Sequence, residues 1–168
     1  NAIEFKAKTD RIPKQFEEFI REGVESGLVT GILANYSLID INVCVNDGGF
    51  HPEFSTDVAF RSAAIMALRD AVRAAQPVML EPIMKMEVIT PDEHLGDVLG
   101  DLNSRRGKIK EMVAQDGTQV VHAEVPLAEL FGYATSLRSA TRGRASYSME
   151  PCLFDIVPES LKNSILNR

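Results

Sequence analysis

The sequence predicts an α+β fold in two parts, of which the second has the element order βαββαβ. Three observations predict it. Apolar residues recur at every second position in short segments, they recur every three or four positions in longer ones, and Gln76-Pro77 interrupts the pattern near the middle. A helix is expected to end there, because the residue before proline avoids the helical region and proline lacks an N–H. We therefore expect two domains, spanning residues 1–79 and 80–168.

The first part is expected to contain two strands and two helices. Residues 2–8 carry apolar side chains at alternate positions, which is typical of a half-buried strand. Pro13 suits the first turn of a helix, and apolar residues then recur at helical spacing. Gly27 and Gly31 are typical of the turn that ends such a helix.

The second strand is expected over residues 37–46, where isoleucine and valine alternate with mostly polar residues. It ends at Asn-Asp-Gly-Gly, a cluster of residues that tolerates the positive φ angles of turns. Ser55 or Thr56 can then cap a helix that reaches about Ala75. The narrow inner face of this helix is predicted to consist of Phe60, Ala64, Ala67, Leu68 and Ala71.

The second part is predicted to be a split βαβ unit, with two helices on one face of a four-stranded antiparallel sheet. Its expected elements are a strand at 84–88, a helix after Pro91 and Asp92, a hairpin of strands 108–115 and 119–125, a helix after Pro126 and a strand at 145–156. Asp116-Gly117 is the two-residue turn of the hairpin. The inner positions of the second helix are predicted as Leu130, Phe131, Ala134, Leu137 and Thr141.

The composition is that of an ordinary globular protein. Of the 168 residues, 45% are apolar and 25% are charged, which excludes collagen-like and disordered chains. No run approaches the roughly 18 apolar residues of a membrane span, and no secretory signal is recognisable. We therefore expect a cytoplasmic protein without a membrane partner. The chain starts at Asn1 rather than Met, and we expect it to be an excised piece of a longer polypeptide.

No motif in the chain predicts catalysis, a cofactor site or a metal site. The stretch from Gly100 to Lys108 resembles a phosphate loop, but six residues rather than four separate its two glycines and no Ser/Thr follows the lysine. The three histidines and two cysteines lack metal-binding spacing. The formal net charge of −6 argues against a protein that coats nucleic acid with a basic surface, although it allows a local basic patch.

Two basic groups and one loop are the candidate binding features. The first group consists of Arg105, Arg106, Lys108 and Lys110, and the second of Arg138, Arg142 and Arg144. Such cations can contact phosphate oxygens, or they can simply oppose the dipole at a helix C-terminus, and composition leaves both interpretations open. Gly132, inside the predicted helix, costs about 1 kcal/mol relative to alanine, which favours a close approach by another backbone or a ligand. The loop of Gly48, Gly49, Phe50 and His51 can stack on or hydrogen-bond to irregular RNA.

Four long motifs, in order, closely resemble the C-terminal part of the translation elongation factor G family. They are Leu80-Glu81-Pro82-Ile83-Met84, the twelve residues from Gly96 to Gly107, the eleven residues from Val125 to Thr135, and Leu137-Arg138-Ser139. The resemblance covers almost the whole chain and is strongest over residues 77–149. It implies that residues 1–79 form part of domain IV, with a ribosomal-protein-S5 domain-2-like fold that lacks its start, and that residues 80–168 form domain V, which is ferredoxin-like.

The resemblance also implies a function for the parent protein. Members of the family are ribosome-dependent GTPases that drive the movement of transfer RNA and messenger RNA, so GTP and magnesium are expected in a G domain upstream of this chain. The tip of domain IV enters the decoding region of the small subunit, and domain V contacts large-subunit RNA. The expected partners are therefore ribosomal RNA of both subunits, ribosomal proteins and the tRNA–mRNA pair, and DNA is not among them.

The resemblance carries these roles onto particular residues. His51 matches the histidine of the domain IV tip loop, and the helix after Gly132 matches the part of domain V that faces large-subunit RNA. The expected ribosome-contacting residues are Gly48, Gly49, Phe50, His51, Arg105, Arg106, Lys108, Gly132, Tyr133, Ala134, Thr135, Arg138 and Arg142.

The tip loop departs from the usual family sequence. Most members read Tyr-His-x-Val-Asp-Ser-Ser, whereas this chain reads Phe-His-Pro-Glu-Phe-Ser-Thr over residues 50–56, so the aspartate is lost. The loop resembles that of relatives specialised for ribosome recycling, which act with the ribosome recycling factor. Translocation is the first hypothesis and recycling the second, and a stand-alone ferredoxin-like interaction module is an alternative of another class.

Overall fold

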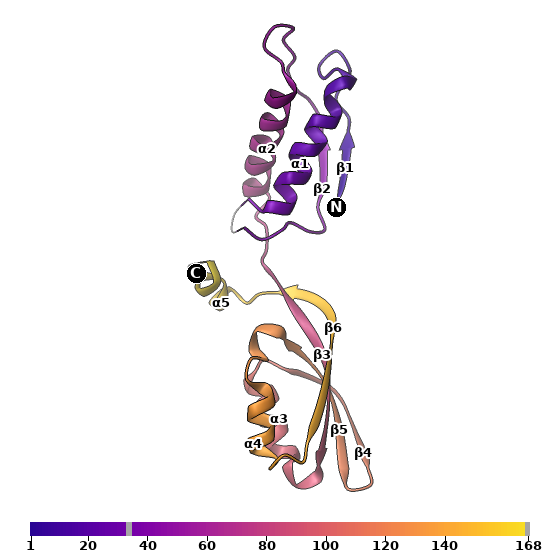
Figure 1. Ribbon diagram of the computed structural model, residues 1–168, viewed down its shortest axis with the longest axis vertical. Helices are drawn as coiled ribbons and strands as arrows, with labels where there is room; N and C mark the ends of the chain where they lie inside the picture. The colour runs from indigo at the N-terminus through magenta and orange to yellow at the C-terminus, as the bar shows by residue number, and fades with distance from the viewer. Residues whose placement is uncertain (33–34, 167–168) are drawn as a thin grey trace. The chain divides into compact units, whose positions relative to one another are not determined.

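The computed structural model describes residues 1–32 and 35–166, in two compact units, Asn1–Pro77 and Val78–Arg168 (Figure 1). We call them the N-terminal and the C-terminal unit and describe each by itself. Among the described residues, no helix is long and apolar enough to cross a membrane.

The N-terminal unit contains a parallel pair of short strands, β1 (Ala2–Phe5) and β2 (Asn42–Val45), and two helices, α1 (Glu17–Thr30) and α2 (Asp57–Ala74). The two helices lie side by side (Figure 1). A 3₁₀ turn, Lys14–Phe16, leads into α1. The buried core residues of the unit are Ile12, Phe16, Ile20, Val24, Leu28, Phe60, Ala64, Leu68 and Val72, with side chains of both strands packed against them. The strand and helix types follow the sequence prediction, and the differences lie at the ends.

The second strand is shorter than predicted because Asp40 has a positive φ of 56°, a conformation that strands do not contain. Pairing with β1 therefore begins at Asn42. The first helix continues past Gly27, which is buried inside it, and ends at Gly31, whose φ is 76°. Thr56 is the cap of α2, since its Oγ1 accepts a hydrogen bond from the Ala59 N–H at 3.2 Å.

The inner face of α2 is less rich in alanine than predicted. Phe60, Ala64 and Leu68 are buried as expected, but Ala67 and Ala71 are exposed. Val72 takes the last buried position, because Ala64, Leu68 and Val72 continue the four-residue spacing that keeps one helix face inward. The helix therefore buries larger side chains than the prediction gave it.

Replacing Gly23 with alanine should destabilise the N-terminal unit by about 1–2 kcal/mol. A Cβ at this position in α1 would lie 2.6 Å from the backbone oxygen of Arg61 in α2 and 3.1 Å from the Ala64 Cβ. In an open helix the same change would stabilise by about 1 kcal/mol, but here the two helices have to separate. Urea unfolding measures the loss. Ser26→Ala, at an exposed position of α1, is the control and should stay within about 0.5 kcal/mol of wild type. Equal stabilities of the two variants would contradict close helix packing at Gly23.

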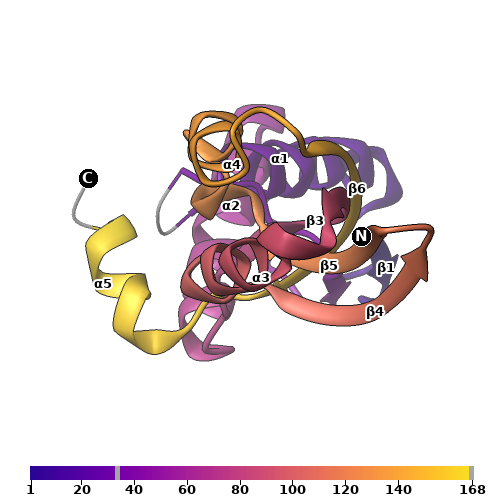
Figure 2. The same ribbon diagram turned by 90° about the horizontal axis from the view of Figure 1, so that it is seen from below.

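The C-terminal unit has the predicted order βαββαβ. Its six elements are β3 (Leu80–Pro91), α3 (Leu95–Ser104), β4 (Lys108–Gln115), β5 (Thr118–Pro126), α4 (Tyr133–Ala140) and β6 (Ser146–Ile156). The strands form one antiparallel sheet in the order β4-β5-β3-β6, and α3 and α4 cover one face of it (Figures 1 and 2). A further helix, α5 (Glu159–Leu166), follows β6 and is not predicted from the sequence.

The core of this unit follows from the alternation of its central strands. The core contains three side chains from each of the two paired central strands, Met84, Met86 and Val88 of β3 and Val121, Ala123 and Val125 of β5. Against them pack four side chains of α3 and α4, namely Val98, Leu102, Tyr133 and Leu137. The predicted turn between β4 and β5 is also confirmed. Asp116 and Gly117 have φ angles of 41° and 79°, as a type I′ hairpin turn requires.

The start of the second helix is the main correction in this unit. A 3₁₀ turn, Leu127–Glu129, follows Pro126 as predicted, but helix α4 begins only at Tyr133, because Gly132 adopts a left-handed φ of 77° and forms its N-cap. Tyr133 is therefore the inward aromatic residue, 1% exposed, whereas Phe131 is 81% exposed. Ala134 is also exposed rather than inward. A Cβ on Gly132 would meet no atom within 4 Å, so no other segment of the described chain approaches it closely, and its left-handed φ accounts for the glycine.

Candidate nucleic-acid interface

The loop of residues 46–56, here called the tip loop, joins β2 to α2 and is held by hydrogen bonds between its own residues. The Ser55 Oγ accepts a hydrogen bond from the His51 N–H at 2.8 Å, and the His51 carbonyl accepts one from the Ser55 N–H at 2.9 Å. The His51 Nδ1 accepts a further bond from the Glu53 N–H at 3.2 Å. The neutral imidazole therefore carries its proton on Nε2 and can donate from an exposed position.

An ion pair holds the start of the tip loop. The Arg11 guanidinium donates to both carboxylate oxygens of Asp47, at 2.9 and 3.1 Å. This bond, with a further one from the Gly48 N–H, lowers the pKa of Asp47 below its ordinary value. A Cβ on Gly48 would lie 2.7 Å from the Ile12 side chain, so a larger residue at this position would force the Ile12 side chain to shift. The sequence-predicted residues of this loop are thus brought together as one short, fixed segment.

In the first basic group, Arg105 is engaged inside the unit. Its side chain is only 16% exposed, and it donates to the Asp101 carboxylate at 3.0 Å, the Glu129 carbonyl at 2.6 Å and the Ser136 Oγ at 3.0 Å. The guanidinium also lies 5.2 Å from the ring centre of Tyr133. Through these hydrogen bonds, Arg105 links the end of α3 to the segment before α4 and to the first turn of α4.

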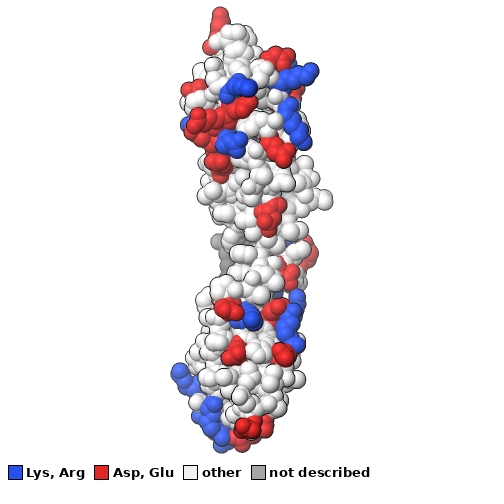
Figure 3. Space-filling model, turned by 90° about the vertical axis from the view of Figure 1, so that its right-hand side faces the viewer, with Lys and Arg blue, Asp and Glu red and all other residues white. Residues whose placement is uncertain are grey.

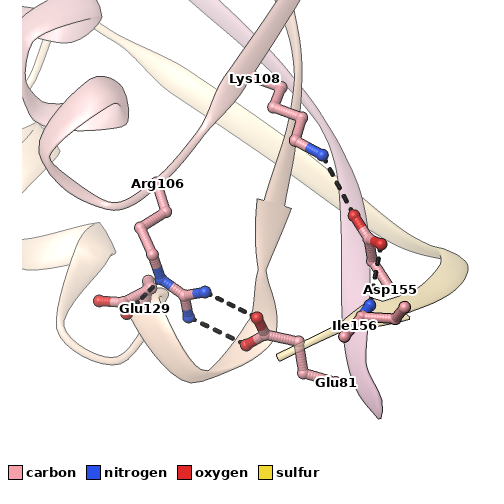
Figure 4. A network of polar contacts seen from close by, with 6 residues as sticks. All are labelled: Glu81, Arg106, Lys108, Glu129, Asp155 and Ile156. Atoms are coloured by element: carbon pink, nitrogen blue, oxygen red, sulfur yellow. Dashed lines mark hydrogen bonds and ion pairs between the residues drawn. The ribbon is translucent and has the colours of Figure 1, made fainter. Parts of the chain in front are cut away.

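Arg106 is the centre of a network of ion pairs (Figure 4). It has a positive φ of 60° and donates to both oxygens of Glu81, at 2.6 and 2.9 Å, and to Glu129 at 2.9 Å. The bonds to Glu81 are the main cause of a raised Arg106 pKa. Nearby, Lys108 pairs with Asp155 at 3.1 Å. The first basic group is therefore largely neutralised by carboxylates of the same unit.

The second basic group contains cations that are not neutralised in this way. Arg144 pairs with Glu93, but Arg138 and Arg142 are exposed, and their side chains have no hydrogen-bond or ion-pair partner among the residues that the structure describes. Arg138 lies in the last turn of α4, where a cation is favourable in itself. Arg142 lies beyond the helix with a φ of 53°. Among the described residues of the unit, these two arginines are the cations most available to a phosphate group.

The exposed residues around these arginines form what we call the α4 surface. It consists of Phe131, Gly132, Ala134, Thr135, Arg138 and Arg142, all of which are exposed. Sequence reasoning missed Phe131 by placing it in the core. The glycine that follows it was the available signal, since glycine often marks a left-handed residue that ends one turn and begins another. Tyr133, predicted as a contact residue, is buried and can only support this surface.

Charge on the rest of the molecule is mixed. On the face drawn in Figure 3, basic and acidic side chains are interspersed in each unit. The described residues contain no group of three or more histidine, cysteine, aspartate or glutamate side chains placed to hold a metal ion. Gly100 lies within α3, so the stretch to Lys108 does not fold as a phosphate loop.

Comparisons with known proteins match both units to one family. The family model for elongation factor G, domain IV, matches residues 1–76, and the one for the elongation factor G C-terminus matches residues 78–165. A relative from Chlamydia caviae named elongation factor G is 48% identical over 157 residues, which are 94% of this chain and 23% of that protein. A crystal structure of a protein from Thermus thermophilus matches with a TM-score of 0.86 and 37% identity, over 99% of this chain and 25% of that one. The chain thus spans about a quarter of the relatives it matches, and it belongs to the elongation factor G family.

Proposed function

We propose that this chain is the ribosome-contacting C-terminal part of a GTPase that moves tRNA and mRNA through the ribosome. The observation that carries the proposal is the pair of exposed, unpaired arginines, Arg138 and Arg142, on the surface that the family resemblance assigns to large-subunit RNA. In this proposal GTP and magnesium bind upstream of the chain, and the protein works in the cytoplasm with ribosomal RNA, ribosomal proteins and the tRNA–mRNA pair.

The α4 surface suits RNA through two different contacts. Arg138 and Arg142 offer guanidinium groups, which bind phosphate oxygens in a forked geometry. Phe131 presents an exposed ring 81% accessible to solvent, and bases of irregular RNA stack on such rings. By contrast Arg105, Arg106 and Lys108 have carboxylate or carbonyl partners in their own unit, so their expected RNA contacts remain a weaker part of the proposal.

Replacing Arg138 or Arg142 with glutamine should lower ribosome affinity and its dependence on salt. Each lost phosphate contact is expected to reduce the slope of log K against log salt by about 1. The measurement is ribosome binding by the full-length protein over a salt series. Arg73→Gln is the matched control, since Arg73 is an exposed arginine in the last turn of α2. A slope for both α4 variants equal to that of the Arg73 control would overturn this assignment.

The family task is tested separately on the full-length protein. A translocation assay and an assay of post-termination subunit splitting with ribosome recycling factor distinguish the two tasks. We expect activity in translocation. The recycling alternative rests on the tip loop, where Pro52 and Thr56 stand in a sequence similar to that of recycling-specialised relatives. Activity in splitting alone would overturn the translocation proposal.

A further inference from the structure

We propose that Phe54, together with His51, forms a stacking platform for one unpaired RNA base. This inference rests on the proposed function, because it names the part of the RNA that the tip loop contacts. Phe54 is not among the residues that the sequence singled out. It stands where the usual family sequence has aspartate, so the platform would be a property of this chain rather than of the family.

The exposure of Phe54 is the first observation. Its side chain is 73% exposed, and its ring centre lies 4.7 Å from that of His51, with the planes tilted by 31°. Phe50 differs, because its ring packs at 5.8 Å on Phe16, which in turn stacks on Phe60 in the core. Phe50 therefore anchors the loop, whereas Phe54 and His51 present ring surface to solvent.

The loop backbone fixes this pair in place. The His51 carbonyl accepts hydrogen bonds from both the Phe54 and the Ser55 N–H groups, at 3.3 and 2.9 Å. The His51 N–H and Nδ1 are also engaged, with Ser55 and Glu53. A loop backbone and an imidazole held in this way lose little conformational entropy on binding, which increases the affinity that a single stacked base can supply.

The charge of the tip loop favours a base over a phosphate. Residues 46–56 contain no lysine or arginine, and they include Asp47 and Glu53. The nearby cation Arg11 is already paired with Asp47. A phosphate would meet an acidic loop, whereas a base can stack on an uncharged ring and accept a hydrogen bond from the His51 Nε2–H. Stacking of this kind tolerates any base.

A protein partner is the other conceivable occupant, and the structure favours it less. A specific protein interface buries about 800 Å² on each side. Phe54 is flanked by Glu53 and Ser55. Apart from the glycines, the only other apolar residues of the tip loop are Phe50 and Pro52. One ring on a small acidic loop suits a single base better than a protein pocket.

The test compares Phe54→Tyr, Phe54→Leu and Phe54→Ala in the full-length protein on ribosomes that carry mRNA and tRNA. All three substitutions lie at an exposed loop position, so circular dichroism should show unchanged folding. Tyrosine keeps an aromatic face and should bind like wild type. Leucine and alanine should weaken binding by about 5- to 150-fold, which corresponds to the 1–3 kcal/mol that one stacked base supplies. The salt slope should not change.

Base reactivity toward dimethyl sulfate, which modifies adenine and cytosine, and toward a carbodiimide, which modifies uracil and guanine, identifies the contact. We expect one unpaired base to be protected by wild type and Phe54→Tyr and to become reactive with Phe54→Leu and Phe54→Ala. Leucine binding as tightly as wild type would indicate an apolar protein contact, and equal binding of all variants would show that Phe54 contacts nothing. Either result overturns the platform while leaving ribosome binding intact. Absence of ribosome binding by the wild-type protein would instead overturn the proposed function, and the platform with it.

Discussion

Replacing Arg106 with methionine is expected to destabilise the C-terminal unit by about 3 kcal/mol. The Glu81 side chain is 10% exposed, and both of its oxygens accept hydrogen bonds from Arg106, whose own side chain is 28% exposed. Removal of the guanidinium leaves the Glu81 and Glu129 carboxylates without their shared counter-charge. Breaking a buried pair in this way costs about 3–5 kcal/mol, and partial exposure places this pair at the lower end. Hydrogen exchange of the β3 and β5 amides reports the stability of this unit separately.

Two further variants define the cause of this loss. Lys110→Met is the matched control, because Lys110 also pairs with a glutamate, Glu124 at 2.9 Å, but is 52% exposed. Loss of the Lys110–Glu124 ion pair should lower the free energy of unfolding by less than about 1 kcal/mol. Glu81→Gln in the Arg106→Met background should recover part of the stability, since it removes the uncompensated charge. If Arg106→Met were as stable as the Lys110 control, the network would contribute no more to stability than an exposed ion pair, and this prediction would be wrong.

This network shows what the sequence could not predict. The elements of the C-terminal unit were predictable because the alternation in β3 and β5 reflects burial of one sheet face, a local pattern with period two. The partners of Arg106 are distant, since Glu81 lies 25 residues before it and Glu129 lies 23 residues after it. Composition therefore shows four cations within six residues, but not that each of them pairs with a carboxylate of the same unit.

Backbone conformation also limited how much of the structure could be predicted from the sequence. The ends of the elements depend on residues with positive φ, and Asp40, Arg106 and Arg142 adopt it without being glycine. Single-residue preferences predict such angles poorly, because the surrounding structure imposes them. At the candidate site, the sequence correctly ended the strand near Asn46, but Gly48 and Gly49 do not adopt the positive φ expected of them and the turn lies at residues 52–54. The exposure of Phe54 and Phe131 became clear only from the structure.

Replacing Arg105 with methionine is expected to reduce both the stability of the C-terminal unit, by about 2 kcal/mol, and ribosome affinity. The side chain donates to Asp101, to the Glu129 carbonyl and to Ser136. Their loss leaves partly buried acceptors without donors, each at a cost of about 1–3 kcal/mol, offset in part by relaxation of the segment. That segment carries Phe131 and the left-handed Gly132, so the α4 surface loses its fixed geometry. Hydrogen exchange and ribosome binding measure the two effects.

The salt dependence of binding distinguishes positioning from contact. If Arg105 only positions the α4 surface, Arg105→Met weakens binding at every salt concentration with an unchanged slope, whereas Arg138→Gln lowers the slope by about 1. Arg105→Lys sharpens the distinction. Lysine keeps the charge, but one ammonium cannot reproduce the planar fork that reaches Asp101, Glu129 and Ser136 together. It should therefore behave like methionine. Full recovery by lysine, or a lower slope with methionine, would mean that Arg105 acts through its charge on phosphate, and that the internal bonds are secondary.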